Sequence, residues 1–159
     1  MSVSLRLPLL LTGIALLCTN CHKSSDPTPP IQPSRVELLT QHAWRESAAT
    51  YTVTENGITT TRDIYAQLPA CRRDNFTKYN VDRSYTNDEG ATLCDPADPQ
   101  VRTSTWDFFS NESEFVYAPN SPFTILYQIK TLNATTFSIE RSSTAQGRTE
   151  TYAYTLTAI

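Results

Sequence analysis

The stretch "WRESAATYTVTENGITTTRDIY", residues 44–65, decides the fold of this chain. It contains two runs rich in Thr, Tyr, Val and Ile, which are typical of β-strands. The runs flank Glu55-Asn56-Gly57, and Asn-Gly favours the tight turn between two antiparallel strands because it tolerates positive φ angles. The stretch therefore predicts a β-hairpin made of residues 44–54 and 58–65.

Short strand patterns continue to the C-terminus. Their predicted ranges are 75–81, 84–88, 101–109, 114–117, 123–131, 135–141 and 149–159. The second hairpin turns at Asp82-Arg83, and the third at the polar residues 110–113. Period-two patterning in eight or nine short strands is typical of an antiparallel barrel or sandwich. Because the connections are short and sequential, we predict an all-β, up-and-down barrel of about eight strands.

A short helix is predicted just before the first strand. Ser34 and Glu37 have the spacing of a capping box, and residues up to His42 continue the helix. We expect this helix to plug or flank the barrel that follows.

The barrel interior is predicted to be either packed with side chains or open to one small ligand, since both occur in barrels of about eight strands. Aromatic residues at strand spacing suit either role, as lining of a ligand site or as core. These candidates are Trp44, Trp106, Phe123, Tyr127, Phe137 and Tyr154.

The N-terminal residues indicate export. Arg6 precedes the apolar run 7–17, an order typical of a secretory signal. A membrane-spanning helix needs about 20 apolar residues, so the run is too short to be one. We expect residues 1–20 to be a signal peptide and residues 21–33, rich in Pro and Ser, to be a polar tether. The folded domain is then expected over residues 34–159.

Residues 18–22, Cys-Thr-Asn-Cys-His, have the spacing of covalent haem attachment, and Cys-x-x-Cys also fits a redox pair or half of a zinc site. However, Cys18 adjoins the signal, and the tether after Cys21 is unsuited to enclosing a haem. The segment instead resembles a bacterial lipoprotein signal, in which cleavage precedes a Cys that is then acylated. Asn20 and the tether favour Cys21 over Cys18 as the lipidated residue, and ordinary secretion is the alternative. Several acyl chains would anchor the protein in the cell envelope, with the outer membrane as the expected site.

Cys71 and Cys94 are predicted to form a disulfide. If the second hairpin turns at Asp82-Arg83, these two residues lie across its open end, near enough to bridge. Export implies an oxidising compartment. The alternative is a reactive thiol whose pKa Arg72 and Arg73 would lower, although no His lies nearby in the sequence.

Three segments together resemble the small lipocalin-like domain of lipoproteins from Gram-negative bacteria. They are "LLTQHAWRESA" (38–48), "DIYAQLPACRRDNFTKYNVDRSYTNDEGATLCDPADP" (63–99) and "STWDF" (104–108). The resemblance covers about residues 36–159 and implies a compact up-and-down barrel, an N-terminal lipid tether and pairing of Cys71 with Cys94. It also implies a small apolar ligand. Members of this family tend to have Asp-Gly at the turn where this chain has Asp82-Arg83.

The sequence offers little for catalysis, metals or nucleic acid. The net charge is −3, which gives no basic footprint for nucleic acid. The chain has two His residues, His22 and His42, and neither a phosphate-binding loop nor a nucleophile elbow is present. We therefore expect no enzyme, metal or cofactor. The predicted function is a lipid-anchored barrel that binds a small hydrophobic ligand, and the alternative is a filled, non-catalytic structural or interaction module whose protein partner is unknown.

Overall fold

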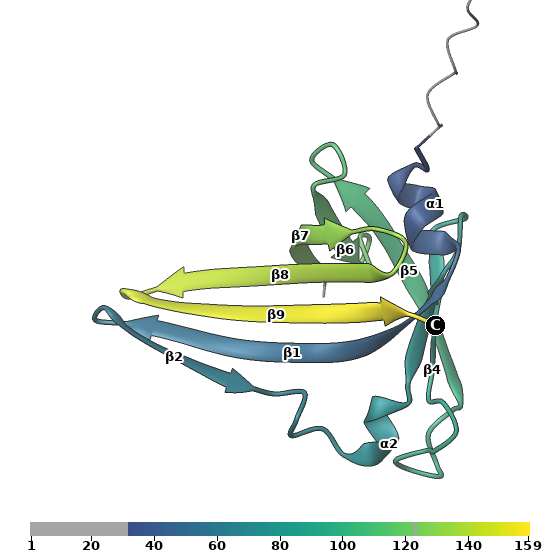
Figure 1. The fold of residues 1–159 in the computed structure, drawn as a ribbon, viewed down its shortest axis with the longest axis horizontal. Coiled ribbons are helices and arrows are strands. Elements are labelled where there is room, and N and C mark those ends of the chain that lie inside the picture. The colour runs from purple at the N-terminus through teal and green to yellow at the C-terminus, as the bar shows by residue number, and fades with distance from the viewer. Residues whose placement is uncertain (1–31, 123) are drawn as a thin grey trace, which may run out of the picture. The chain divides into compact units, whose positions relative to one another are not determined.

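The computed structural model describes residues 32–122 and 124–159 as an all-β domain with two short helices (Figure 1). Residues 1–31, which include the predicted signal peptide, Cys18, Cys21 and most of the tether, lie outside the described residues, as does Phe123. The helices are α1 (Arg35–Thr40) and α2 (Ala70–Arg73). The strands are β1 (Ala43–Glu55), β2 (Ile58–Asp63), β3 (Phe76–Tyr79), β4 (Ser84–Asp88), β5 (Val101–Phe109), β6 (Glu114–Tyr117), β7 (Ile125–Leu132), β8 (Thr136–Ala145) and β9 (Arg148–Ala158).

Eight of the strands close into an antiparallel barrel. Each strand from β3 to β8 pairs with the next one along the chain. β1 pairs with β3 at its start and with β9 from Trp44 to Glu55, which closes the ring. The prediction of an up-and-down barrel is confirmed. In the part of the chain that the structure describes, no helix is long and apolar enough to span a membrane.

One strand, β2, lies outside the ring of eight. β2 does not pair with β3, because β1 lies between them. The outer residues of β1, Thr50 to Glu55, pair with β2, whereas Ala43 and Trp44 at its start pair with β3. β2 is therefore a ninth strand beside the barrel, and residues 64–75, including α2, lead the chain from β2 to β3.

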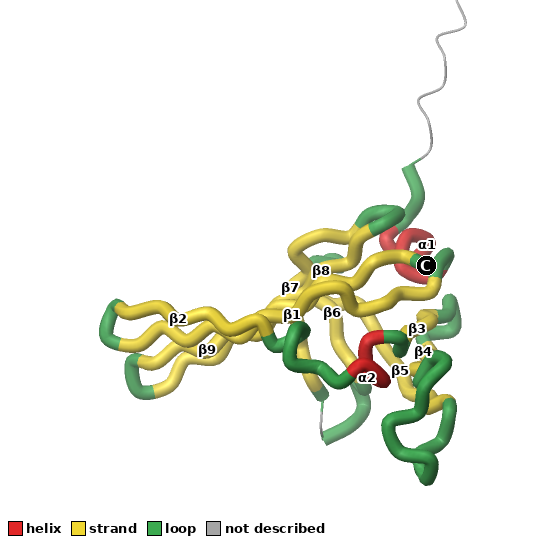
Figure 2. The backbone as a smooth tube through the Cα atoms, turned by 60° about the horizontal axis from the view of Figure 1, so that its bottom comes forward, coloured by secondary structure: helices red, strands yellow, loops and turns green. Residues whose placement is uncertain are grey.

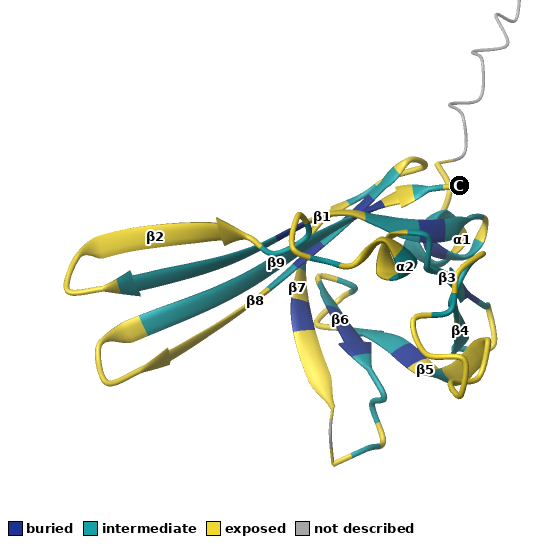
Figure 3. Cartoon of the chain, turned by 90° about the horizontal axis from the view of Figure 1, so that it is seen from below, coloured by how far each residue is buried: buried dark blue, intermediate teal, exposed yellow. Residues whose placement is uncertain are grey.

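The outer parts of β1 and β9, together with β2 and β8, form a four-stranded arm (Figure 2). One face of the arm carries hydroxyl pairs across neighbouring strands, with oxygen–oxygen distances of 2.7 to 2.9 Å. These pairs are Thr52–Thr61, Thr54–Thr59, Ser142–Thr151 and Thr144–Thr149. Figure 3 shows that β2 is exposed along its length, whereas the buried residues gather in the barrel.

A β-bulge in β1 changes which of its side chains face the barrel interior. The register with β9 shifts between Glu46 and Ala48, so one extra residue is inserted there. Before the bulge, Trp44 is fully buried; after it, Ala49 is buried while Ala48 is exposed. The inward set on β1 is therefore Trp44, Glu46 and Ala49.

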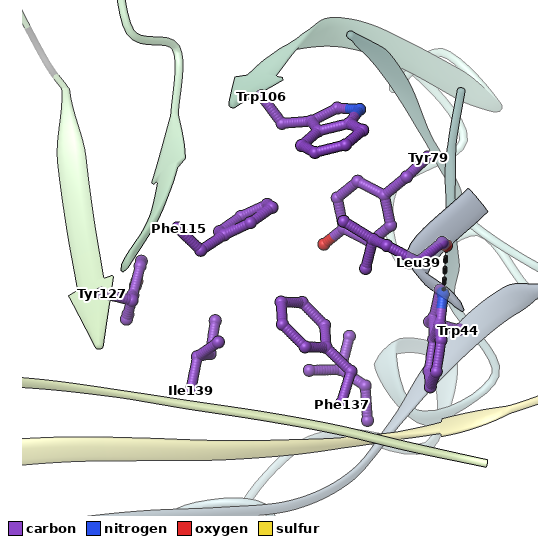
Figure 4. Close-up of a cluster of buried hydrophobic side chains, with 9 residues drawn as sticks. Leu39, Trp44, Tyr79, Trp106, Phe115, Tyr127, Phe137 and Ile139 are labelled. Carbon is purple, nitrogen blue, oxygen red and sulfur yellow. Dashed lines mark hydrogen bonds between the residues drawn. The ribbon is translucent and has the colours of Figure 1, made fainter. Parts of the chain in front are cut away.

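Helix α1 covers one end of the barrel, as its sequence predicts. Ser34 and Glu37 form the complete capping box. Leu39 is fully buried, and its carbonyl oxygen accepts a hydrogen bond of 2.8 Å from Trp44 Nε1 (Figure 4). The helix thus fixes the first barrel strand through both packing and a hydrogen bond.

Aromatic residues dominate the core beneath α1. The buried cluster consists of Leu39, Trp44, Tyr79, Trp106, Phe115, Tyr127, Phe137, Ile139 and Leu156 (Figure 4). Phe115 lies at its centre, with ring centroids 5.5 Å from Tyr79 and 5.3 Å from Phe137, both edge to face. This geometry suits the opposite charges of ring faces and edges and adds to the burial of apolar area.

The second hairpin forms, but its predicted register is off by one residue. The backbone N–H of Asn80 donates to the carbonyl oxygen of Ser84 at 2.9 Å, which leaves the three-residue loop 81–83 rather than a two-residue turn. Such loops end in a left-handed residue, and Arg83 has a φ of 69°. The strained Arg83 is held by its guanidinium, which lies 4.6 Å from the Trp106 ring centre and 3.5 Å from the Asp107 carboxylate.

The disulfide between Cys71 and Cys94 is confirmed, with Cα atoms 5.2 Å apart. Cys71 lies in α2, and Cys94 lies in the loop between β4 and β5, so both are beyond the paired ends of the hairpin. The shifted register therefore does not prevent the bridge, which ties α2 to the β4–β5 loop.

Candidate ligand-binding cavity

The barrel interior is packed beneath α1 and hollow towards α2, which lies at the opposite end in Figure 1. The hollow part is a cavity of about 550 Å³. Strands of the barrel contribute Trp44, Glu46, Ala49, Tyr117, Tyr127, Ile139, Tyr154 and Leu156 to its wall. The segments near α2 and the adjoining strand ends contribute Ile64, Leu68, Arg72, Asn75, Phe76, Thr77, Asn87, Glu89 and Arg102.

The structure separates the aromatic candidates into two groups. Trp44, Tyr127 and Tyr154 line the cavity, and Trp44 and Tyr127 also belong to the buried core. Trp106 and Phe137 are fully buried core residues that do not line the cavity. The sequence pattern identifies all of these as inward-facing, but it does not distinguish the packed end of the barrel from the hollow end.

Four tyrosines run from the core to the cavity wall. The hydroxyls of Tyr79 and Tyr117 are hydrogen-bonded at 2.5 Å, and burial raises the pKa of both. The rings of Tyr117 and Tyr127 lie 5.9 Å apart at an interplanar angle of 89°, and those of Tyr127 and Tyr154 lie 6.0 Å apart at 80°. The rings of Tyr79 and Tyr117 are tilted by 36°, whereas the two later pairs are nearly perpendicular. Tyr117, Tyr127 and Tyr154 line the cavity.

Glu46 is the acidic residue on the barrel side of the cavity wall. It faces Leu156 of β9 in the strand register and is half-buried. Its carboxylate makes no hydrogen bond or ion pair with the described residues, and burial raises its pKa. Burial also raises the pKa of Tyr127 and of Tyr154, and the negative charge of Glu46 contributes to both rises.

The two arginines at the α2 side are more exposed than Glu46. Arg72 and Arg102 are exposed, and Arg102 forms an ion pair of 2.6 Å with Asp98. Glu89 accepts a hydrogen bond of 3.0 Å from the side-chain amide of Asn75. This side of the cavity is therefore polar and reaches solvent, whereas the barrel side is aromatic and aliphatic.

A smaller hollow of about 370 Å³ lies between the start of β7 and the arm. It forms because β7 pairs with β8 only from Gln128 onward, so the two strands diverge before that point. Its lining includes Ile125, Leu126, Arg141 and Tyr152. Ile125, two residues before the inward Tyr127, is 37% exposed for the same reason.

The sequence candidates omit most of the lining residues, among them Glu46 and Tyr117. A signal for Glu46 exists, because it lies two residues after the inward Trp44 in a strand whose alternation points it to the interior. Within residues 32–122 and 124–159, no three His, Cys, Asp or Glu side chains gather in a geometry that could hold a metal ion.

Comparison with known proteins gives no relative: no family model and no curated protein matches this chain.

Proposed function

We propose that this protein is a lipid-anchored, non-catalytic envelope protein whose barrel binds one small amphipathic ligand. The observation that carries the proposal is the cavity of about 550 Å³ in the barrel interior. Ligand sites in proteins typically measure about 300–1,000 Å³ and combine an apolar wall with a few polar groups. This cavity has both features, with aromatic and aliphatic side chains on the barrel side and polar groups towards α2.

The division of the barrel supports the same proposal. The aromatic cluster beneath α1 fills one end of the barrel. The cavity lies beside this cluster and shares Trp44, Tyr127, Ile139 and Leu156 with it. Leu68, Arg72 and Asn75 come from the segment between β2 and β3 and form part of the cavity wall. Since loops and short segments carry binding residues on a rigid scaffold, this segment is suited to selecting the ligand.

The anchor and the resemblance to lipocalin-like lipoproteins also favour this function. A ligand-binding barrel tethered to a membrane by acylated Cys21 would meet amphipathic molecules at the membrane surface. The proposed location is the cell envelope, with the outer membrane as the expected membrane.

Ligand uptake is tested with the full chain and a neutral anilinonaphthalene dye that fluoresces when it leaves water. Leu68→Trp should fill part of the cavity and abolish uptake, whereas the matched control Val81→Trp, at a turn residue that is 74% exposed, should retain it. Native mass spectrometry of the full chain should show a bound molecule or a bound dye. Absence of any ligand or dye in the unmodified protein would contradict the proposal.

The arm favours a second candidate function, a structural or protein-interaction module. None of the β2 residues is buried, and Ile58 at its start is 71% exposed. A photo-crosslinker at Ile58 should then give one reproducible envelope product, while a crosslinker at the equally exposed Val81 should not. Identical patterns at both positions would count against a role for the arm.

A further inference from the structure

We propose that the cavity selects ligands that carry a protonated amine or quaternary ammonium group, bound by Glu46 and the aromatic rings around it. The inference rests on the proposed ligand-binding function and adds the chemical class of the ligand. Three observations carry it: the carboxylate without a partner, the aromatic faces beside it and the placement of the other charges.

The first observation is that Glu46 has no structural task in the described part of the chain. The ion pairs there use Asp98, Asp107, Glu140 and Glu150, and the helix cap uses Glu37. A carboxylate that is partly removed from water without a hydrogen bond or a counter-charge destabilises the fold. A cationic ligand in the cavity would supply the missing counter-charge.

The second observation is the kind of side chain that surrounds the cavity with Glu46. Trp44, Tyr117, Tyr127 and Tyr154 line the same space. The electron-rich faces of such rings attract cations, most strongly when water is excluded, and cages of aromatic rings recognise ammonium groups. Nearly perpendicular neighbouring rings, as between Tyr117 and Tyr127 and between Tyr127 and Tyr154, form walls on more than one side of a ligand.

The third observation concerns the remaining charges. Arg72 and Arg102 line only the α2 side and are exposed, and Arg102 is already paired with Asp98. Arg141 on β8 influences Tyr127 and Tyr154, but its guanidinium lies 4.8 Å from the Tyr152 ring centre on the arm and does not line the cavity.

The charged residues are therefore distributed unequally between the two sides of the cavity wall. Glu46 is the one described charged residue on the barrel side of the wall, and the second acid of the wall, Glu89, lies on the α2 side. A ligand with an ammonium group at one end and an apolar body therefore fits with its cation towards Glu46. A carboxylate in the same position would meet a like charge.

The test compares three small probes that share a phenyl ring and a short chain but differ in charge. Phenethylammonium is the cation, phenethyl alcohol is the neutral analogue and hydrocinnamate is the anion. Calorimetric titration of the full chain at neutral pH should give an affinity at least about tenfold higher for phenethylammonium than for phenethyl alcohol, with hydrocinnamate weakest. Glu46→Gln should remove this preference and still bind the alcohol. Glu55→Gln, which changes an exposed Glu at the far end of the same strand, should retain it.

A pH series provides a second readout. Protonation of Glu46 removes its charge, so the affinity for phenethylammonium should fall as the pH drops through the carboxyl's pKa, which burial raises above its ordinary value of 4.5. Affinity for phenethyl alcohol should not change in that range. The other charged or titratable groups of the wall are Tyr117, Tyr127, Tyr154, Arg72, Arg102 and Glu89, and Arg141 interacts electrostatically with Tyr127 and Tyr154. Glu89→Gln is the control for the second acid of the wall.

The outcomes separate the two proposals. Equal affinity for phenethylammonium and phenethyl alcohol, or a preference that survives Glu46→Gln, overturns the inference and leaves ligand binding in the cavity intact. If the protein takes up the neutral dye but does not bind phenethylammonium, the inference is likewise overturned and ligand binding in the cavity stands. If neither the dye nor any of the three probes binds, the proposed function and the inference both fail.

Discussion

Gly90 holds the end of the second hairpin close to α2. Its φ is +69°, and a Cβ atom placed on it would lie 2.6 Å from the carbonyl oxygen of Asp74. The Asp74 carboxylate also accepts a hydrogen bond of 3.0 Å from the backbone N–H of Ala91. The chain therefore needs a residue without a side chain here for two reasons, the backbone conformation and the close approach.

Gly90→Ala is expected to lower the free energy of unfolding by more than about 2 kcal/mol. Gly57→Ala is the matched control, because Gly57 has a similar φ of +77° with nothing within 4 Å of the added Cβ. Its expected cost is only the backbone strain, about 1–2 kcal/mol. Urea denaturation measures the free energy of unfolding of both variants. Equal losses would show that Asp74 moves away from the added Cβ atom without a further loss of stability.

Glu46 illustrates a residue that weakens the fold where it lines the cavity. Burial raises the pKa of its carboxyl, so the folded protein binds the proton more readily than the unfolded chain does. The ionised form is therefore destabilising at neutral pH, and this cost disappears as the pH falls below the ordinary value of 4.5. Residues that lower stability at a cavity are typical of functional sites.

Glu46→Gln should raise the free energy of unfolding at neutral pH. Solvent reaches part of the side chain, so screening keeps the expected gain below about 1 kcal/mol. The difference between the variant and the unmodified protein should shrink as the pH drops towards 4.5. Thermal or urea denaturation across this pH range measures it, and a destabilised variant at neutral pH would show that the carboxylate has a partner after all.

Among the elements, α2 depends most on its covalent link. It has four residues, its N-cap makes no side-chain hydrogen bond and none of its residues is buried. Arg73 donates hydrogen bonds of 3.0 Å to the Leu68 carbonyl and 2.8 Å to the Ala66 carbonyl. The disulfide adds the connection to the β4–β5 loop, and Arg72 next to Cys71 lines the cavity.

The double variant Cys71→Ala/Cys94→Ala is expected to lose about 3–4 kcal/mol of stability, because the bridge closes a separation of 23 residues. Hydrogen exchange should rise over residues 66–74, whereas β8 and β9, paired with each other along ten residue positions, should change least. Addition of a reductant to the unmodified protein should reproduce the variant, and reductant should leave the variant itself unchanged. Unaltered hydrogen exchange over residues 66–74 would show that the Arg73 hydrogen bonds hold this segment in place without the disulfide.

The domain as a whole has a packed end and a hollow end within one barrel. The aromatic cluster beneath α1 contains six side chains that are fully buried: Leu39, Trp44, Tyr79, Trp106, Phe115 and Phe137. The cavity occupies the end near α2, where the strands are joined by longer segments. Lining residues outside the core cluster, such as Leu68 and Asn75, can therefore change without loss of a core side chain.

Attachment of the whole protein to a membrane is tested by metabolic labelling with a fatty acid. Cys21→Ala should abolish the label, because the expected signal cleavage precedes this residue, and Cys18→Ala should retain it. The opposite result would move the anchor to Cys18. Absence of label from the unmodified protein would favour secretion without lipid.

Local signals in the residues predict much of the fold. Asn56-Gly57 predicts the first hairpin, the capping box of Ser34 and Glu37 predicts α1, and period-two patterning places Phe137 and Ile139 in the interior. The pairing of Cys71 with Cys94 also follows from the hairpin they flank. Each of these depends on contacts between residues that are near in the sequence or joined by one turn.

Other features are decided only by the tertiary structure. The left-handed Arg83 and its three-residue loop depend on Trp106 and Asp107 from the next strand. The position of β2 outside the barrel depends on which strands pair with β1 along its length. The tertiary structure also decides which inward side chains belong to the packed core and which line the cavity. Alternation in one strand shows that a residue faces inward, but whether it meets another side chain or open space depends on strands far away in the sequence.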